Sequence, residues 1–397
     1  MAAQEETGHS HCYDAIVVGA GIQGSFAAYW LAKRQQNTLL LEQFPLPHTR
    51  GSSHGQSRII RSAYPQDYYT DMMGEAYRLW AELEAKTGTK LYRQTPTLFL
   101  GRQEDPEFQS YRQTMERYNI PGETFTPQAL AQRFPGIRPC GGEMAVSDLS
   151  AGILYANKAL QAVQDQFRHS GGTVRDGEKV LSILPGDLVT VTTSQGKYQA
   201  KRLVIAAGPW TSHLLVPLGL QLPLQPLRIS VCYWKVKDHD QNRVAALERL
   251  PCFLAIKLSG EGHDIYGLPV DEYPGLVKIC YHNGIPVDPD KPDQLSQTSA
   301  DIQILEEFVS KYLPGLDPKP AVQERCIYTN TPDEDFVLDQ HPHFRNMIIG
   351  AGFSGHGFKF APVIGKILCE LSLGEKPIYN LAPFQISRFS TLPKAVL

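Results

Sequence analysis

Residues 13–42 read YDAIVVGAGIQGSFAAYWLAKRQQNTLLLE, which predicts a buried strand, a glycine turn, a helix and a second strand. Gly19, Gly21 and Gly24 form a GxGxxG pattern: the first allows a tight turn, the second lets backbone approach a pyrophosphate, and the third lets the helix pack closely on the strand. The free N–H groups and positive dipole end at the start of the helix suit phosphate groups. The stretch therefore predicts a dinucleotide-binding unit.

Glu42 ends the second strand of this unit, 18 residues after Gly24. A carboxylate at this place can hold a pair of ribose hydroxyls, and it argues against a 2′-phosphate and hence against NADP. A glycine fingerprint alone is weak evidence because glycines also serve ordinary turns. Here the strand, the helix and the acid all agree, so we favour the dinucleotide interpretation, although the pattern does not separate NAD from FAD.

The composition indicates a globular protein of more than one domain. The chain has 397 residues, 42% of them hydrophobic, and its net charge of −3 gives no sign of a nucleic-acid partner. The seven cysteines are far apart and without CxxC spacing, which fits a reducing compartment better than a disulfide framework or a metal site. No secretory signal and no apolar run of membrane-spanning length is present, so we expect a soluble intracellular protein with no metal.

The C-terminal part of the chain repeats the strand, glycine turn and helix pattern of the N-terminal part. Residues 346–350 predict a strand, AGFSGHG a glycine turn, and residues 358–373 a helix. Gly352, Gly355 and Gly357 give this turn a flexible backbone. A further buried strand, residues 202–210, ends in small residues and Gly208, which leaves room for a ligand across the strand end. Two glycine-rich turns at opposite ends suggest one large cofactor, and FAD fits this better than NAD alone.

The middle of the chain has a different pattern. Residues 220–321 contain short strands separated by Pro and Gly, which predicts a mostly antiparallel second domain. Helices are predicted over residues 71–90, 155–169 and 301–312. The predicted fold is mixed α/β, with a Rossmann-type cofactor domain and a second, mostly antiparallel substrate domain. We assign residues 1–90, 150–220 and 322–397 to the cofactor domain, and residues 91–149 and 221–321 to the substrate domain.

A polar loop, residues 44–65, follows Glu42 and is longer than a minimal turn needs. It carries His54, Arg58 and Arg61, and the spacing of the two arginines puts them on one side of any helical turn. A solvated basic loop is the ordinary interpretation. The position directly after the dinucleotide unit makes anion binding at least as reasonable.

With these motifs the sequence resembles the monomeric sarcosine oxidase family of flavoproteins, most closely its animal, peroxisomal branch, which includes L-pipecolate oxidases. The segments that carry the resemblance run from residue 14 almost to the end, and they are DAIVVGAGIQG, PHTRGSSHGQSRIIRSAY, VRDGEKV, LVIAAGPW, PLQPLR, CIYTNTPDEDFVLDQHP and IIGAGFSGHGFKFAPVIGKIL.

The resemblance implies a monomeric FAD-dependent oxidase of secondary L-amino acids. Sarcosine, L-pipecolate and L-proline form the substrate class, the C–N bond is oxidised to an imine, and O₂ is reduced to H₂O₂. For sarcosine, hydrolysis of the imine gives glycine and formaldehyde. The nearest alternative is a related dehydrogenase that passes electrons to a protein acceptor. An alternative from another class is a noncatalytic FAD- or NAD-binding module.

The resemblance also implies the roles of individual residues. Cys326 matches the cysteine that forms a thioether with the flavin 8-methyl carbon, a reaction that needs a soft thiolate. Arg61 and Lys359 match the pair that holds the substrate carboxylate, for which a guanidinium fork and a second cation are suited. Lys278 matches a lysine on the flavin side where oxygen is reduced and charge develops.

The remaining implied residues surround the same place. Arg58 is expected beside the flavin, where it is a candidate to share the catalytic role of Lys278, and its neighbour Ser57 is expected to bind the cofactor. Lys359 is expected to contact the cofactor as well as the substrate. Four residues are expected to line the active site or to serve in packing and hydrogen bonding, with equal weight on the two roles: His54, Tyr266, His282 and Tyr328. Because imidazole titrates near neutrality, His282 is a candidate for favouring the neutral form of the substrate amine.

The C-terminus departs from the pattern that the resemblance implies for location. The animal branch is peroxisomal and is expected to end in a tripeptide like Ser-Lys-Leu, which an import receptor reads. This chain ends in Ala395, Val396 and Leu397, so Val396 stands where a basic residue is usual. We therefore expect a peroxisomal protein on the strength of the resemblance, with the cytoplasm as the alternative.

Overall fold

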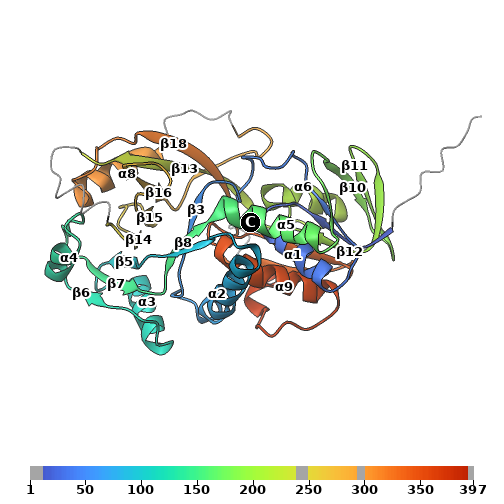
Figure 1. Ribbon diagram of the computed structural model, residues 1–397, viewed down its shortest axis with the longest axis horizontal. Helices are drawn as coiled ribbons and strands as arrows, with labels where there is room; N and C mark the ends of the chain where they lie inside the picture. Colours follow the sequence, from blue (N-terminus) through green and yellow to red (C-terminus); the bar gives the residue numbers. More distant parts are fainter. Residues whose placement is uncertain (1–11, 238–248, 293–299, 392–397) are drawn as a thin grey trace, which may run out of the picture.

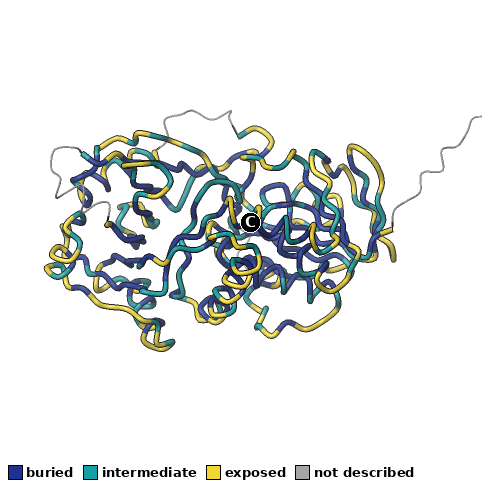
Figure 2. Tube along the Cα trace, in the orientation of Figure 1, coloured by how far each residue is buried: buried dark blue, intermediate teal, exposed yellow. Residues whose placement is uncertain are grey.

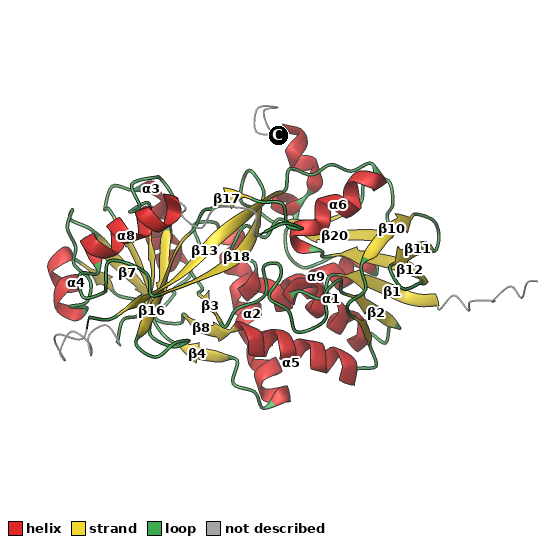
Figure 3. Cartoon of the chain, turned by 90° about the horizontal axis from the view of Figure 1, so that it is seen from above, coloured by secondary structure: helices red, strands yellow, loops and turns green. Residues whose placement is uncertain are grey.

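The computed structural model describes residues 12–237, 249–292 and 300–391. Two large sheets lie at opposite ends of an elongated molecule, with helices α1, α2, α5 and α9 nearer the first sheet (Figures 1 and 3). The C-terminal tripeptide considered above lies outside the described residues. Within those residues, every helix is too short or too polar to span a membrane.

The first sheet has eight strands and a parallel centre. Its main path is β10-β11-β12-β1-β2-β9, and β20 pairs with β12 and β19. Strands β1, β2, β9, β12 and β20 form the parallel pairs, while β10, β11 and β19 join through antiparallel pairs. The bounds are β1 Cys12–Val18, β2 Thr38–Leu41, β9 Thr173–Arg175, β10 Val180–Leu184, β11 Val189–Thr193, β12 Lys197–Ile205, β19 Val337–Gln340 and β20 Met347–Ala351.

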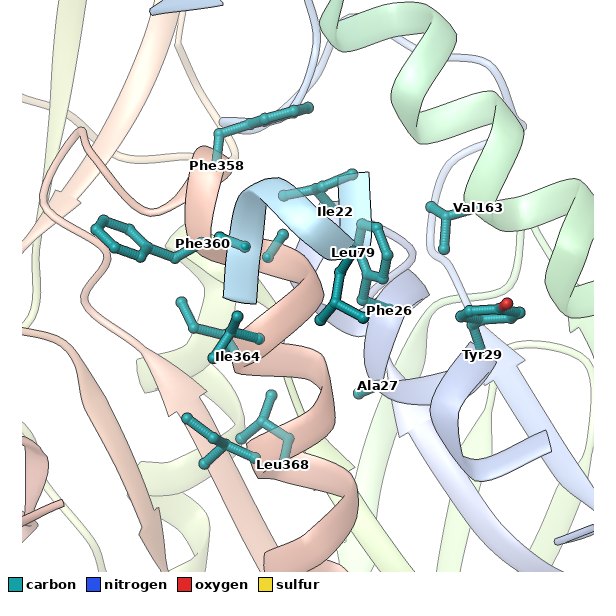
Figure 4. Close-up of a cluster of buried hydrophobic side chains, with 14 of the residues drawn as sticks. Ile22, Phe26, Ala27, Tyr29, Leu79, Val163, Phe358, Phe360, Ile364 and Leu368 are labelled. Atoms are coloured by element: carbon teal, nitrogen blue, oxygen red, sulfur yellow. The ribbon is translucent and has the colours of Figure 1, made fainter. Parts of the chain in front are cut away.

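Both faces of this sheet are covered, as the apolar run at its centre requires. Val17 packs into the core beneath one face, whereas its neighbours Ile16 and Val18 pack into the core on the other, as alternation along a strand dictates. The first of these cores contains side chains of four helices, α1 Ile22–Lys33, α2 Asp67–Thr87, α5 Ala156–His169 and α9 Ala361–Ser372. Figure 4 shows Phe26, Leu79 and Ile364 among the side chains of this core.

The second sheet has nine strands and is antiparallel except for the parallel pair β5 and β14. Its path is β17-β13-β16-β15-β14-β5-β7-β6, and β18 pairs with the other edge of β13. The bounds are β5 Thr97–Gly101, β6 Thr124–Phe125, β7 Met144–Asp148, β13 Gln225–Lys235, β14 Cys252–Ala255, β15 Ile265–Leu268, β16 Leu276–Tyr281, β17 Ile285–Pro286 and β18 Val322–Asn330. Helix α8, Ala300–Tyr312, packs Phe308 and Tyr312 into its core beside Trp234 and Phe253.

The remaining elements are short. A three-stranded sheet joins β3 Ser57–Ile60, β8 Gly152–Tyr155 and β4 Tyr92–Gln94. The other helices are α3 Pro106–Arg117, α4 Pro127–Arg133, α6 Thr211–Leu215, and the 3₁₀ turns η1 Gly208–Trp210, η2 Val216–Leu218, η3 Phe358–Phe360, η4 Ala382–Phe384 and η5 Ile386–Thr391. Figure 2 shows that much of the exposed chain lies in the turns and loops around the periphery.

Three details differ from the sequence-based expectations. The helix expected at residues 71–90 begins earlier, as α2 Asp67–Thr87, and Gly88 in the left-handed conformation ends it. The segment of Arg58 and Arg61, considered above as a helical turn, is a strand: Arg58 lies within β3 and Arg61 directly follows it. Strand β18 falls in the segment 322–397 that we assigned to the cofactor domain, yet its hydrogen bonds join it to the second sheet.

Candidate functional site

A long cavity of about 1310 Å³ runs between the two sheets, which exceeds the roughly 300–1,000 Å³ of most small-ligand pockets. Both glycine turns line it, together with residues of the second sheet such as Tyr266, Lys278 and Cys326. Its size and the spread of its lining along the chain suit a large cofactor and a small substrate together.

One end of the cavity is the first glycine turn. Gly19 has φ +102°, and a Cβ there would lie 2.4 Å from the carbonyl oxygen of Ala206; a Cβ on Gly24 would lie 1.9 Å from the carbonyl oxygen of Gly19. These positions therefore require glycine, as expected for close packing of helix on strand. Gly21 is the N-cap residue of α1, and because it has no side chain it offers no side-chain acceptor to the first N–H groups of the helix.

Glu42 lies beside this turn at the end of β2. Its Oε2 accepts the Ala20 N–H at 2.9 Å and its Oε1 accepts the Phe44 N–H at 3.1 Å. The carboxylate is buried and lines the cavity, so backbone donors hold it at the place where the sequence predicts a ribose contact.

The second glycine turn reaches the same cavity. Gly352 and Gly355 have φ +63° and +77°, and a Cβ on Gly355 would lie 2.3 Å from the ring of Tyr328. The Gln23 side chain of α1 donates to the Gly357 carbonyl at 2.9 Å and so ties the two turns together. Gly208, the first residue of η1 and three residues after β12, also lines the cavity.

Two cations face the middle of the cavity. The Arg61 guanidinium lies 4.0 Å from the centre of the Tyr64 ring, and the Lys359 ammonium donates to the His356 carbonyl at 3.0 Å. Among residues 12–237, 249–292 and 300–391, neither cation forms an ion pair with a carboxylate. Burial, together with Arg61 and Arg58, holds the pKa of Lys359 well below its usual value.

Lys278 lies on β16 at the cavity wall and differs from Lys359 in having a carboxylate partner. Its Nζ is 2.8 Å from Glu272 Oε1, and the two side chains are 7% and 4% exposed. The hydroxyl of Ser57, which the sequence assigns to the cofactor, donates to the same Glu272 oxygen.

Cys326, His54 and Arg58 meet on one side of the cavity. Cys326 is half-buried on β18, with its Sγ 3.8 Å from the Ser52 carbonyl oxygen. The His54 ring nitrogens lie 3.0 Å from the Gly51 and 2.9 Å from the Arg325 carbonyl oxygen, and burial lowers the pKa of His54. The guanidinium of Arg58 donates to three carbonyls of the surrounding loop, those of Ser52, His54 and Ser57.

Three ring-bearing residues, Tyr266, His282 and Tyr328, also line the cavity, and His282 is an electrostatic neighbour of Arg61 and Lys359. The Tyr328 hydroxyl lies 3.2 Å from the Tyr266 hydroxyl and 3.4 Å from His282 Nδ1. Burial, Lys359 and Arg61 lower the pKa of His282 to about 4, which corrects the titration near neutrality assumed from the sequence. His282 is therefore neutral at physiological pH, because the charged imidazolium is disfavoured both by burial and by two cations.

Comparisons with known proteins show the family of the chain as a whole. A model described as FAD dependent oxidoreductase matches residues 14–371. Peroxisomal sarcosine oxidase from Mus musculus is 56% identical over 100% of each chain. The chain belongs to the sarcosine oxidase family of FAD-dependent oxidoreductases. Within that family, monomeric sarcosine oxidase from Bacillus sp. (strain NS-129) is 36% identical, with 97% of this chain and 99% of the other covered.

Solved structures give the same fold. The structure of NikD, an unusual amino acid oxidase essential for nikkomycin biosynthesis, superposes with a TM-score of 0.81 at 24% identity, covering 95% of this chain and 98% of the other. Membership of the family confirms the predicted mixed α/β fold, with its FAD-binding and largely antiparallel sheets, and it confirms that the protein is an FAD-dependent oxidoreductase.

The residues along the cavity fit the family's cofactor. Gln23 Oε1 and Thr329 Oγ1 line the cavity and are buried without a hydrogen-bond partner among the described residues. Buried polar atoms are nearly always paired, so these two are acceptor and hydroxyl positions available to a polar ligand. With the glycine turn, the start of α1 and Glu42, they form a site suited to the ribose, phosphate and ring atoms of FAD.

Sequence reasoning missed three residues of this site. His356 lies within the quoted glycine turn, and its Nδ1 is buried without a partner among the described residues. Asp264 lines the cavity from the segment without distinctive motifs, and burial with Glu107 nearby raises its pKa to about 7. Glu272 is the partner of Lys278, and the one sequence feature that could have indicated it is its position six residues before Lys278 in the hairpin of β15 and β16.

Proposed function

We propose that this protein is a monomeric oxidase of small secondary L-amino acids such as sarcosine, L-pipecolate and L-proline, producing an imine and H₂O₂. The observation that carries the proposal is the pair Arg61 and Lys359. Both cations face the cavity, and neither has a carboxylate partner among the described residues. A substrate carboxylate supplies the missing charge.

The geometry gives the cations specific tasks. Arg61 can bind a carboxylate through two parallel N–H groups, and stacking on Tyr64 at 4.0 Å restricts its position. Lys359 adds a second charge from the opposite end of the chain. Fixing the carboxylate at two points orients the rest of a small amino acid, which is a positioning contribution to the rate.

The same charges act on the substrate amine. Two nearby cations disfavour a third positive charge, so they favour the neutral amine that is ready for oxidation. His282 stays neutral and adds no charge, and the Tyr266 and Tyr328 hydroxyls form a polar rim beside it. FAD, when bound, supplies the two-electron oxidation of the C–N bond and the transfer of electrons to O₂.

We propose further that Cys326 holds the cofactor covalently through an 8α-S-cysteinyl bond, that Ser57 and Arg58 lie beside the flavin, and that Lys278 serves oxygen reduction. The position of Cys326 at the cavity wall supports the bond. For the domains, we propose the division given from the sequence, with residues 322–330 moved to the substrate domain because β18 pairs with β13.

The covalent bond can be tested by acid precipitation. Wild-type protein should retain yellow colour in the pellet, and Cys326→Ser should release all flavin to the supernatant. Cys140→Ser is the matched control, since this exposed cysteine lies elsewhere. Flavin released equally from wild type and variant would contradict the bond while leaving FAD binding intact.

The reaction can be tested by mixing the protein anaerobically with sarcosine, L-pipecolate and L-proline, with glycine as the primary-amine control. We expect bleaching of the flavin by the secondary amines, and recovery with stoichiometric H₂O₂ when oxygen is admitted. Bleaching without oxygen consumption would indicate the dehydrogenase alternative, and no bleaching would indicate a binding module.

We also propose a peroxisomal location, which the Mus musculus relative, peroxisomal sarcosine oxidase, has in its name. Ala395, Val396 and Leu397 would serve as the import signal. An N-terminal fluorescent fusion should enter peroxisomes and should remain in the cytoplasm when these three residues are deleted.

A further inference from the structure

A buried polar cluster stands behind Lys278. The ammonium on β16 lies 2.8 Å from Glu272 Oε1, in the turn between β15 and β16, with both side chains almost fully buried. Glu272 does not line the cavity, whereas Lys278 does. The turn thus places a carboxylate directly behind a cation that faces the cavity.

Other elements hold the carboxylate in place. Ser57 on β3 donates to its Oε1, and the Tyr233 hydroxyl on β13 donates to its Oε2 at 2.6 Å. Although burial opposes ionisation, Lys278 and these donors keep the pKa of Glu272 below its usual value. Both Ser57 and Tyr233 are buried, so the carboxylate has three partners from three strands and little freedom to turn.

The ammonium depends on this carboxylate in two ways. A buried lysine without a counter-charge tends to lose its proton, and removing one partner of a buried ion pair is strongly unfavourable. A lysine side chain is also flexible, with four methylene groups and three rotatable donors. Beyond Glu272, the other contacts of Lys278 with described residues are weaker, with Ser57 Oγ at 3.5 Å and the Tyr233 ring centre at 5.6 Å.

We propose that Glu272 is a positioning residue for the reduction of oxygen: it keeps the Lys278 ammonium protonated and fixed at the cavity wall. This inference rests on the proposed function, in which Lys278 serves that step. A purely structural ion pair would instead hold the β15–β16 turn and affect both halves of the reaction alike.

The groups around Lys278 show which variant can serve as a control for Glu272→Gln. Among the described residues, Tyr233 on β13 lies beside Lys278, Cys280 on β16 is an electrostatic neighbour, and Glu324 on β18 accepts from the Tyr233 hydroxyl. Arg58 on β3 and Cys326 on β18 line the same cavity. The Tyr273 hydroxyl donates to Glu324 at 2.5 Å but has no contact with Lys278 among the described residues. Tyr273→Phe therefore alters the same network at a distance from the ammonium.

The test separates the two halves of the reaction in holoenzyme by stopped flow. Glu272→Gln should slow flavin reoxidation by about tenfold or more, while flavin reduction by sarcosine stays within about twofold. Glu272→Asp should restore part of the rate, and Tyr273→Phe should behave as wild type.

A second measurement does not depend on activity. In thermal unfolding, Glu272→Gln should lower Tm by several degrees more than the double variant Glu272→Gln/Lys278→Met, because the second change removes the uncompensated charge. If Glu272→Gln impairs folding, Glu272→Asp gives the same comparison with a weaker effect.

The outcomes are distinguishable. If Lys278→Met slows reoxidation and Glu272→Gln does not, the proposal for Glu272 is overturned and the proposed function stands. If neither variant slows reoxidation, Lys278 has no role with oxygen, and both assignments are overturned. Equal losses in reduction and reoxidation for Glu272→Gln would also overturn the proposal, in favour of a structural ion pair.

Discussion

Lys359 and Lys278 line the same cavity as buried lysines, yet their surroundings are opposite. Lys278 lies 2.8 Å from a buried carboxylate, whereas Lys359 has no carboxylate partner among the described residues and has Arg61 and Arg58 among its electrostatic neighbours. A cation with a built-in partner already has its charge balanced, while one beside other cations gains most from an incoming anion. The difference indicates a fixed charge at one place and an anion-binding site at the other.

The largest expected effect concerns the anion-binding site. Arg61→Met should raise KM for sarcosine roughly 100-fold, because it removes a two-point charged contact with the carboxylate. Steady-state kinetics of oxygen consumption measure this. Arg102→Met, a change at an exposed arginine outside the cavity, is the control. A near-normal KM in Arg61→Met would show that Arg61 does not bind the substrate carboxylate. The contrast between an anion-binding site at Lys359 and a fixed charge at Lys278 would then be unsupported.

A smaller effect should appear in proton linkage at Lys359. A bound carboxylate raises the low pKa of this ammonium, so binding takes up protons in the pH range between the free and bound values. Calorimetry of acetate binding in buffers of different ionisation enthalpy should show this uptake. It should disappear in Lys359→Met and persist in Lys376→Met, which alters an exposed lysine. Identical heats in all buffers for wild type would contradict the linkage.

The smallest effect should come from Asp264, which lies in the electrostatic neighbourhood of Arg61. Because burial and Glu107 raise its pKa to about 7, Asp264 is neutral below that pH and becomes a carboxylate above it. The carboxylate competes with the substrate for Arg61, so KM should rise about threefold as the pH passes through 7. Asp264→Asn should remove the part of the rise centred there. A wild-type pH profile shared by the variant would show that Asp264 does not influence Arg61.

Much of the first glycine turn and its surroundings could be predicted from sequence, because many of the contacts that shape it join residues that are close along the chain. Gly24 approaches the Gly19 carbonyl and Glu42 accepts from Ala20, all within 30 residues, so their pattern along the chain already describes their arrangement. The domain boundary at residue 322 depends instead on a long-range contact, the pairing of β18 with β13. The run at residues 322–330 has a visible strand pattern, but nothing in it says which sheet it joins.

The sequence by itself determined the dinucleotide turn and the acid at its second strand, and the family resemblance led to the proposed roles of Arg61, Lys278, Cys326 and Lys359. Only the tertiary structure decided the charge environment of these groups. The pKa of His282 near 4 and the contrast between the two lysines depend on residues brought together from distant segments. Charge interactions and desolvation depend on distance in space, which the order of residues along the chain does not record.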